Sequence, residues 1–385
     1  MSEGTTRENW LVQEVAAGRV DTVALSFADR LGGWRGKRVP ASDFVERGSA
    51  ALGFCDGMIV CDIQCGVIEE TPFTNYSTGY PDLHVTFDAR DARPMGWHPR
   101  EAYVFGVPCD HGGAALSVAP MTVLASVVHR LATQGIEVSV AAELSGAFFD
   151  RDNAPVVSNL ADWSQNLPWL LLNAVHESWI PVAYCTPGFD PGSFALGLER
   201  NAPLELAQSI VVAKGAAKEL ARLRGFDAIF MTRRPKAAQP ALLQFDVVVR
   251  SGSSADAGLV NRLLDEVKPM LFPSINAMRQ RGAPAYSSTS DGGTRWIVSA
   301  SAEADAATAL AAALSAIGVA MEGGEATGHV IDDLARARAL LSCLWAVDWL
   351  GAPFIENSVP LFEYEASLFA DSVTDWEIAR YWGTA

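Results

Sequence analysis

Residues 27–40 read FADRLGGWRGKRVP, and this stretch organises the first part of the chain. Residues 20–27 (VDTVALSF), which end at the start of this stretch, are rich in apolar and β-branched residues, as is typical of a strand. Residues 29–33 contain the aspartate and glycine that turns favour. Residues 34–40 return as a second extended segment that ends at a proline. The pattern predicts a β-hairpin, and the neighbouring segments are interpreted outward from it.

Short elements surround this hairpin. Residues 8–18 predict a short helix that stops at Gly18. Further short strands are expected at 58–64, 83–88 and 102–107, because proline and glycine separate these apolar runs. Residues 109–113 (CDHGG) are typical of a linker. We therefore expect residues 1–112 to form a small sheet-rich domain and residues 113–385 to form a second, larger one.

After the linker, helices and strands follow one another without strict alternation. Apolar residues spaced three and four apart, with Gly135 at the position of a C-cap, predict a helix over residues 121–134. The other helices are expected at 203–224, 256–268, 305–321 and 331–350, with an aromatic-rich helical segment at 361–381. Strands are expected at 137–149, 226–231 and 242–250. This order predicts an α+β protein with a mostly antiparallel sheet.

The composition is that of an acidic globular protein. Hydrophobic residues make up 49% and charged residues 19% of 385 residues, which is enough for two domains. The formal net charge of -16 argues against nucleic-acid and anionic-membrane partners, because both require basic patches. Long apolar runs are absent and the first ten residues (MSEGTTRENW) are polar. We therefore expect a cytoplasmic protein without a membrane span.

The six cysteines and six histidines show no spacing that is typical of a zinc site. Cys61 and Cys65 are the closest cysteines, but no second cysteine pair or histidine pair follows them. We expect all six cysteines to be reduced, buried thiols.

Several motifs, in order along the chain, resemble the glutamine synthetase family. Residues 27–40 follow the family pattern FxDxxGxxRGKxVP, and residues 121–150 reproduce its helix, glycine and strand. The remaining matches are PDLHVTFD at 81–88, PMGW at 94–97, the segments 191–194, 230–231 and 274–276, and the terminus VTDWEIARY at 373–381. The resemblance covers nearly the whole chain. It implies a β-grasp-like N-terminal domain and a C-terminal domain of the family's catalytic type.

The resemblance also implies chemistry, namely an ATP-dependent carboxylate–amine ligase of nitrogen metabolism. Such a ligase phosphorylates the γ-carboxylate of glutamate, and an amine then displaces the phosphate. Magnesium or manganese must neutralise the polyphosphate, and the family holds these ions with glutamates and one histidine. In this chain only Glu143 remains as a possible metal ligand. The other ligand positions have degenerated, and they fall on Ser145, Gly188, Ala195 and Gln244.

Other charged residues near these motifs are alternative candidates. Asp190 and Asp246 stand beside lost ligand positions and could form a rewired acidic site with Glu143. A second set could bind phosphate or carboxylate, since arginine binds both in a bidentate manner; it comprises Arg233, Arg234, Arg279, Arg281 and Arg295, with Lys236 nearby. For all of these residues, a solvated surface charge is the favoured alternative.

Two hypotheses about function stay open at this point. The chain could be a pseudoenzyme of the glutamine synthetase type that binds a small molecule or a partner, or a divergent ATP-dependent ligase with a rewired site. The family assembles into rings whose active sites lie between subunits. Since the hairpin at 27–40 and the terminus at 373–381 keep the family pattern, we expect a ring-like homo-oligomer or a mixed ring with an active family member.

Overall fold

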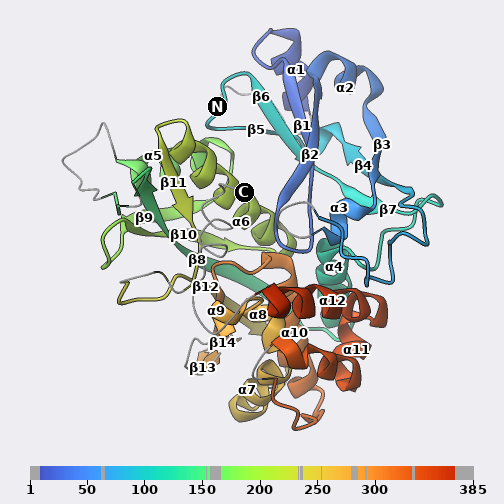
Figure 1. The fold of residues 1–385 in the computed structure, drawn as a ribbon. Helices are drawn as coiled ribbons and strands as arrows, with labels where there is room; N and C mark the ends of the chain where they lie inside the picture. The colour runs from blue at the N-terminus through green and yellow to red at the C-terminus, as the bar shows by residue number, and fades with distance from the viewer. Residues whose placement is uncertain are drawn as a thin grey trace.

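The computed structural model describes residues 9–61, 66–152, 154–156, 166–232, 234, 237–252, 254–278, 285–290, 293–331 and 334–368 (Figure 1). Within these residues the strands form sheets of four, seven and three strands. None of the helices in the described ranges is long and apolar enough to cross a membrane.

The predicted hairpin is present near the N-terminus. Strand β1 (Thr22–Ala28) pairs antiparallel with β2 (Trp34–Pro40), and it pairs in parallel with β6 (Glu101–Phe105). The four-stranded sheet has the order β2-β1-β6-β5, so β2 is an edge strand. The neighbouring elements are α1 (Trp10–Ala16), α2 (Ala41–Arg47), β3 (Ser49–Cys55), α3 (Gly57–Val60), β4 (Asp82–Asp88), the 3-10 turn η2 (Ala89–Asp91), β5 (Arg93–Pro94) and β7 (Val107–Cys109).

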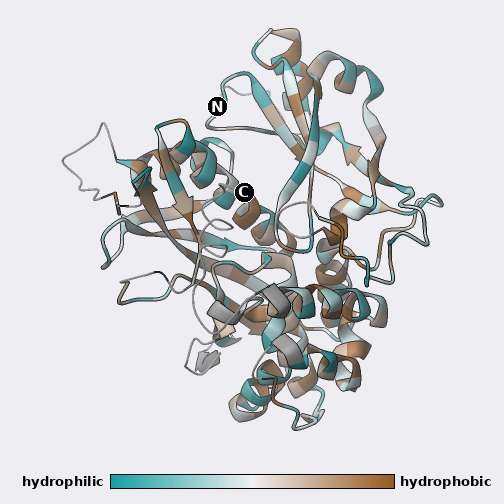
Figure 2. Cartoon of the chain, viewed as in Figure 1, coloured by the Kyte–Doolittle hydropathy of each residue, from teal (hydrophilic) through white to brown (hydrophobic). Residues whose placement is uncertain are grey.

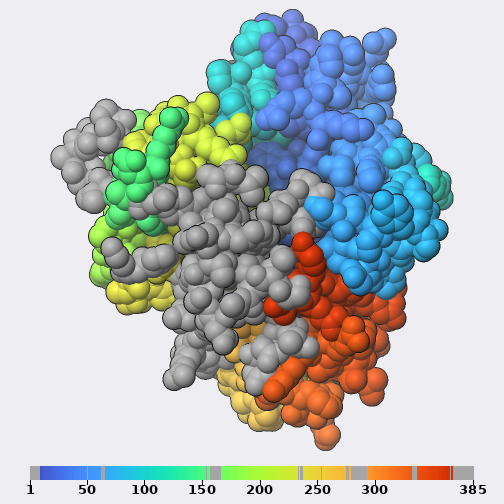
Figure 3. All heavy atoms as spheres, in the orientation of Figure 1, coloured from blue at the N-terminus to red at the C-terminus, as the bar shows by residue number. Residues whose placement is uncertain are grey.

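Strand β1 is buried on both faces, and this links the two halves of the molecule. Val23, Leu25 and Phe27 point into an apolar cluster built from residues 11–119. Ala24, on the opposite face, belongs to the larger cluster that fills the rest of the protein. Side chains alternate along a strand, so the hairpin lies between the two clusters. The N-terminal part packs against the C-terminal helices, as the blue and red surfaces in Figure 3 show.

The seven-stranded sheet is antiparallel throughout its described pairs. Its central strand β8 (Glu137–Asp150) pairs with β10 (Ser193–Asn201), β12 (Leu242–Arg250) and β11 (Phe226–Ile229). The order of the others is β13-β14-β12-β8-β10-β9, which adds β13 (Ala285–Ser290), β14 (Gly293–Ser301) and β9 (Val182–Pro187). The α+β class with antiparallel sheets, predicted from the sequence, is confirmed.

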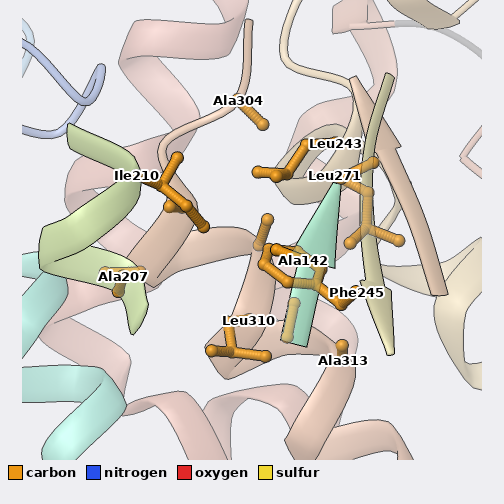
Figure 4. Packing of buried hydrophobic residues seen from close by; sticks show 14 of the residues in the cluster. Ala142, Ala207, Ile210, Leu243, Phe245, Leu271, Ala304, Leu310 and Ala313 are labelled. Carbon is orange, nitrogen blue, oxygen red and sulfur yellow. The ribbon is translucent and has the colours of Figure 1, made fainter. Parts of the chain in front are cut away.

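Helices cover one face of this sheet. On β8, the even-numbered residues from 140 to 148 are buried beneath them. Ala142 on β8 and Phe245 on β12 lie in a cluster with Ile210 and Leu310 from helices (Figure 4). Helix α10 is buried from Ala306 to Ala320, which explains its alanine-rich and largely apolar sequence. Figure 2 shows brown, hydrophobic residues on the helices of this part of the molecule. The helices of this part are α4 (Pro120–Thr133), α5 (Leu167–Glu177), α6 (Pro203–Arg222), α7 (Ala257–Glu266), α8 (Lys268–Leu271), α9 (Ile275–Met278), α10 (Ala306–Met321), the 3-10 segment η3 (Leu334–Ser342), α11 (Leu344–Leu350) and α12 (Ala352–Leu368).

Two expected elements differ from the structure. The strand expected at 58–64 is wrong where it is described, because Gly57–Val60 forms one helical turn; short apolar runs do not distinguish a buried strand from a buried helix. The helix expected at 331–350 is divided, with η3 and α11 on either side of Cys343. The terminal segment is helical up to Leu368, and residues 373–381, including Trp376, lie outside the described ranges. The domain boundary near residue 112 stays a prediction.

Candidate functional site

The ligand positions inferred from the sequence lie on one face of the seven-stranded sheet. The pairing of β8 with β12 places Gln244 opposite Glu143, and the pairing of β8 with β10 places Ala195 opposite Ser145. Alternate residues of paired strands share a face. These four residues are partly exposed, whereas their neighbours Ala142 and Leu144 are buried against the helices. We call these four residues, together with Asp246, Arg200 and Arg295 beside them, the sheet face.

Gly188 lies directly after β9, at the end of the same pairing. Its N–H donates to the carbonyl oxygen of Ser193 at 2.8 Å, which extends the contact between β9 and β10. A Cβ atom at position 188 would lie 2.4 Å from the Ser193 hydroxyl oxygen. A glutamate at this position would therefore require Ser193 to change its rotamer.

Glu143 is held by a tyrosine from a strand two positions away. The hydroxyl of Tyr184 on β9 donates to Glu143. Burial and then this bond raise the pKa of Tyr184 to about 12. The ring crosses Gly197, the residue opposite Glu143 on β10, and a Cβ atom there would lie 2.4 Å from a ring carbon. Glycine at 197 thus provides the space that lets Tyr184 reach the carboxylate.

Asp246 is paired with two arginines. Arg295 on β14 donates from Nε and Nη2 at 2.8 and 2.9 Å, and Arg200 lies 2.8 Å away through its own Nη2. Burial alone would raise the pKa of Asp246, but the bonds from Arg295 and Arg200 outweigh it and hold the pKa below its ordinary value. The three side chains together carry one positive charge. Arg295 therefore lies on the sheet face, as part of an ion-pair network.

Asp190 and Arg234 stabilise a loop. The Asp190 carboxylate accepts the backbone N–H groups of Ala238 and Gln239, both at 2.9 Å, and these bonds hold its pKa below the ordinary value. Arg234 is buried, lies 3.7 Å from Asp190, and burial lowers its pKa. Both side chains are therefore engaged within the protein. The other predicted anion-binding residues, Arg233, Lys236, Arg279 and Arg281, lie outside the described ranges.

Sequence reasoning did not single out Tyr184, Gly197 or Arg200. None of them belongs to a motif. The alternation in residues 193–201, where Phe194, Leu196 and Leu198 are buried, was a signal for a strand and would have placed Gly197 on the open face. The partners of Tyr184 and Arg200 lie on other strands, and only the strand pairing identifies them.

The sheet face does not fit the pair of divalent cations that the family resemblance implies. Magnesium and manganese require several carboxylate oxygens. The positions described here provide Glu143, which is bonded to Tyr184, and Asp246, which is bonded to two arginines. Among the residues with described positions, no group of three or more His, Cys, Asp or Glu side chains is arranged to hold a metal ion.

Comparisons with curated proteins identify ligases as relatives. The chain is 24% identical over 241 residues to gamma-glutamylethanolamide synthetase GlnA4 of Streptomyces coelicolor, covering 57% of this chain and 52% of that protein. It is 24% identical over 269 residues to the glutamate–isopropylamine ligase of a Pseudomonas species, covering 60% and 55%. It is 22% identical over 243 residues to type-1 glutamine synthetase 2 of Dictyostelium discoideum, covering 59% and 47%. The matched regions thus span about half the length of these relatives. No family model matches the chain.

Solved structures share the fold along almost the whole chain. A structure described as a novel glutamine synthase homolog has a TM-score of 0.78 at 15% identity and covers 95% of this chain and 98% of that one. Apo GmaS has a TM-score of 0.73 at 16% identity, covering 95% and 97%, and a GmaS/ADP complex has 0.72 at 16%, covering 95% and 98%. The resemblance inferred from the motifs is confirmed: the chain has the glutamine synthetase fold and is similar in sequence to ligases of the glutamine synthetase family.

Proposed function

We propose that this chain is a glutamine synthetase-like protein that does not form γ-glutamyl amides and instead binds a small molecule or a partner protein. The observation that carries the proposal is the composition of the sheet face. Strand register brings Glu143, Ser145, Ala195 and Gln244 together, yet only Glu143 carries a carboxylate, and this carboxylate accepts a hydrogen bond from Tyr184. Serine, alanine and glutamine at the other positions supply no negative charge for magnesium.

A divergent carboxylate–amine ligase is the second candidate. It is favoured by the relatives, whose names describe synthesis of gamma-glutamylethanolamide and ligation of glutamate to isopropylamine. The positive charge that Arg200 and Arg295 leave beside Asp246 also suits a carboxylate or phosphate group of a substrate. In this candidate Glu143 and Asp246 would belong to the rewired site, and ATP with magnesium or manganese would remain the cofactors.

An activity assay separates the two candidates. Purified protein is incubated with ATP, glutamate, magnesium or manganese, and either ammonia, hydroxylamine, ethanolamine or isopropylamine, and γ-glutamyl products are measured by mass spectrometry. We expect no product above the protein-free control. Turnover on the order of 1 per second or above with any amine would contradict the first proposal. If activity is found and Glu143→Ala abolishes it, the second candidate is supported.

A gain-of-binding experiment tests the cause directly. The quadruple variant Ser145→Glu, Gly188→Glu, Ala195→Glu and Gln244→His is expected to bind manganese in calorimetry more tightly than any of its single variants, because metal ligands act as a unit. The control replaces the same positions with Gln, Gln, Gln and Asn, which adds bulk without charge. Equal manganese binding by the two quadruple variants, with both folded by circular dichroism, would show that these positions are not ligand positions.

The proposal includes assembly into a ring, either with itself or with an active homologue, in the cytoplasm. The supporting observation is that the family-like hairpin at β1 and β2 is present in the fold. Size-exclusion chromatography with light scattering is expected to show a particle larger than a dimer. A monomer at micromolar concentration that does not assemble with a homologue would overturn the ring.

A further inference from the structure

The turn between β1 and β2 meets α10 and α12 around a small cavity, which we call the turn cavity. Its lining includes Arg30, Leu31, Asp305, Thr308 and Ser358, and none of the sheet-face residues. The volume of the cavity is about 20 Å³. One water molecule needs roughly 10–15 Å³ of such space, whereas pockets for small organic molecules begin at roughly 300 Å³. The turn cavity therefore has room for a water molecule or a single ion.

Arg30 contributes a buried hydrogen-bond donor to this cavity. The residue is only 8% exposed. Its two Nη groups donate to the carbonyl oxygens of Val118 and Phe354 and to the hydroxyl of Ser358. Its Nε is buried and has no hydrogen-bond partner among the residues that the structure describes. Because the guanidinium is planar and is fixed by its other bonds, the Nε–H cannot turn toward another acceptor without breaking them.

Asp305 contributes a buried acceptor from the opposite side. The residue is 4% exposed and caps α10, where its Oδ2 accepts the N–H of Thr308 at 2.7 Å. Its Oδ1 is buried and, within the described part of the chain, accepts no hydrogen bond. A Cβ atom on Gly32 would lie 3.4 Å from this Oδ1, so the oxygen faces the hairpin turn. A donor from the turn and an acceptor from the start of α10 thus line one cavity.

The charges of these two groups limit what can lie between them. A buried donor or acceptor without a partner destabilises a fold, and such groups are usually paired with protein atoms or with ordered water. Here no hydrogen bond joins the Nε of Arg30 to the Oδ1 of Asp305. A metal or ammonium ion would be repelled by Arg30, and an anion would be repelled by Asp305. Water accepts from an N–H group and donates to a carboxylate, so it suits both groups at once.

We propose that the turn cavity binds one water molecule, which accepts a hydrogen bond from Nε of Arg30 and donates one to Oδ1 of Asp305. Buried waters typically make about three hydrogen bonds, and Glu303 and Ser358 also line the cavity. The water connects the N-terminal hairpin to the start of α10, while the Nη2 of Arg30 connects the same turn to α12. This site is independent of the sheet face, so its test does not depend on whether the chain forms amides.

A crystal structure of the full-length protein, at a resolution at which ordered waters are visible, tests the site directly. We expect one electron-density peak within roughly 2.6–3.2 Å of both Arg30 Nε and Asp305 Oδ1, with the strength and contacts of a water. A direct bond between the two side chains would overturn the proposal. So would a turn cavity without density, or a peak whose anomalous signal identifies a metal ion or chloride.

Two variants at one lining position test the site in solution. Thr308→Ile adds a methyl group that fills the cavity, and Thr308→Val is the matched control, because it removes the hydroxyl but keeps the size. Magnetic relaxation dispersion of water oxygen counts buried waters that exchange slowly. Thr308→Ile should hold one such water fewer than wild type, and Thr308→Val should hold the same number. A loss in both variants or in neither would overturn the proposal. If Thr308→Ile does not fold, the wild-type crystal structure decides.

Discussion

Charged side chains concentrate in two regions that differ in burial. On the sheet face, Asp246 and its arginines are partly exposed, and Glu143 bonds to Tyr184 beside open space. The second region is the hairpin seam, where the hairpin turn meets α10 and α12; we define it by Asp29, Arg30, Lys214 and Asp305. Asp29, Arg30 and Asp305 are each less than 9% exposed. Charges at the seam are thus part of the packing, while those of the sheet face are not.

Arg30 shows how tightly the seam is built. Its guanidinium donates to the carbonyl oxygens of Val118 and Phe354, each at 3.1 Å, and to the hydroxyl of Ser358. It also lies 4.3 Å over the Phe354 ring. One side chain of the hairpin turn therefore connects the start of α4 with α12.

The two aspartates of the seam hold backbone. Asp29 accepts the N–H groups of Leu31 and Gly33 and the Nε of Arg35, which closes the turn. Asp305 accepts the N–H of Thr308 at 2.7 Å and so caps α10. Gly32, with φ of +72°, packs on Asp305, where a Cβ atom would lie 3.1 Å from the Asp305 Cα.

The motifs that resemble the family lie in two regions with different roles, packing at the seam and surface chemistry on the sheet face. In FADRLGGWRGKRVP, residues 27–30 are buried and make contacts that the fold requires. The residues at the predicted ligand positions on the sheet face are partly exposed, so serine, alanine and glutamine fit there without disturbing the helices below. At the seam, packing limits which residues fit. On the sheet face, only the chemistry of a bound ligand would limit them.

The largest expected effect is at the seam. Arg30→Met should lower the free energy of unfolding by about 3–5 kcal/mol, because it leaves the carbonyl oxygens of Val118 and Phe354 without their donor and removes a buried cation that attracts Asp305. Urea denaturation at pH 7 measures it. Arg38→Met, which removes a mostly exposed arginine paired with Glu101, is the control and should cost a small fraction of this. Similar losses in the two variants would show that the seam is no more tightly constrained than the surface.

The pH dependence of stability sharpens the comparison. Burial raises the pKa of Asp305 from 3.8 to about 6. The folded protein therefore binds this proton more tightly than the unfolded chain, so Asp305 lowers stability as the pH rises from about 4 to 6, by up to about 3 kcal/mol. Asp305→Asn removes this contribution. The variant should gain stability relative to wild type between pH 4 and pH 7, in urea denaturation at constant ionic strength.

Two other seam groups titrate around the same site. Burial also raises the pKa of Asp29; its repulsion of Asp305 is one of the causes that raise the pKa of Asp305, so it belongs to the contribution that the variant removes. Burial lowers the pKa of Lys214 to about 8, so its contribution changes above that pH and leaves the acid range unaffected. A difference between Asp305→Asn and wild type that stays constant from pH 4 to pH 7 would contradict the assignment.

The smallest effect is expected on the sheet face. Tyr184→Phe removes the hydroxyl that bonds Glu143 and should lower the free energy of unfolding by about 0.5–1 kcal/mol, since the pair is partly solvated. It should also remove one phenol that titrates near pH 12 from the ultraviolet absorbance curve. Tyr76→Phe, at a largely exposed tyrosine, is the control. A loss as large as that of Arg30→Met would mean that the sheet face also holds the fold together.

Local patterns in the sequence were enough to predict the hairpin, the helices α1, α4, α6, α7 and α10, and the central strands β8 and β12. Predicting these elements did not require the register between strands, because alternation and helical spacing indicate which residues of each segment are buried. Strands β9, β10 and β14 were not predicted, although Trp296, Val298 and Ala300 alternate in β14. The motif order was also enough to identify Glu143, Ser145, Ala195 and Gln244 as one group, and strand pairing confirms that they are neighbours.

By itself the sequence predicted a set of ligand positions and showed that most of the residues at them carry no charge. The tertiary structure decided which partners the remaining charges have. Tyr184 reaches Glu143 only because Gly197 lies between them, and Arg30 meets Ser358 across 328 positions of the chain. Periodicity in a sequence indicates which face of one segment is buried. An ion pair or hydrogen bond between distant segments requires their polar atoms to lie within about 3 Å of each other. Strand register and helix packing set that distance, and both arise only when the whole chain folds.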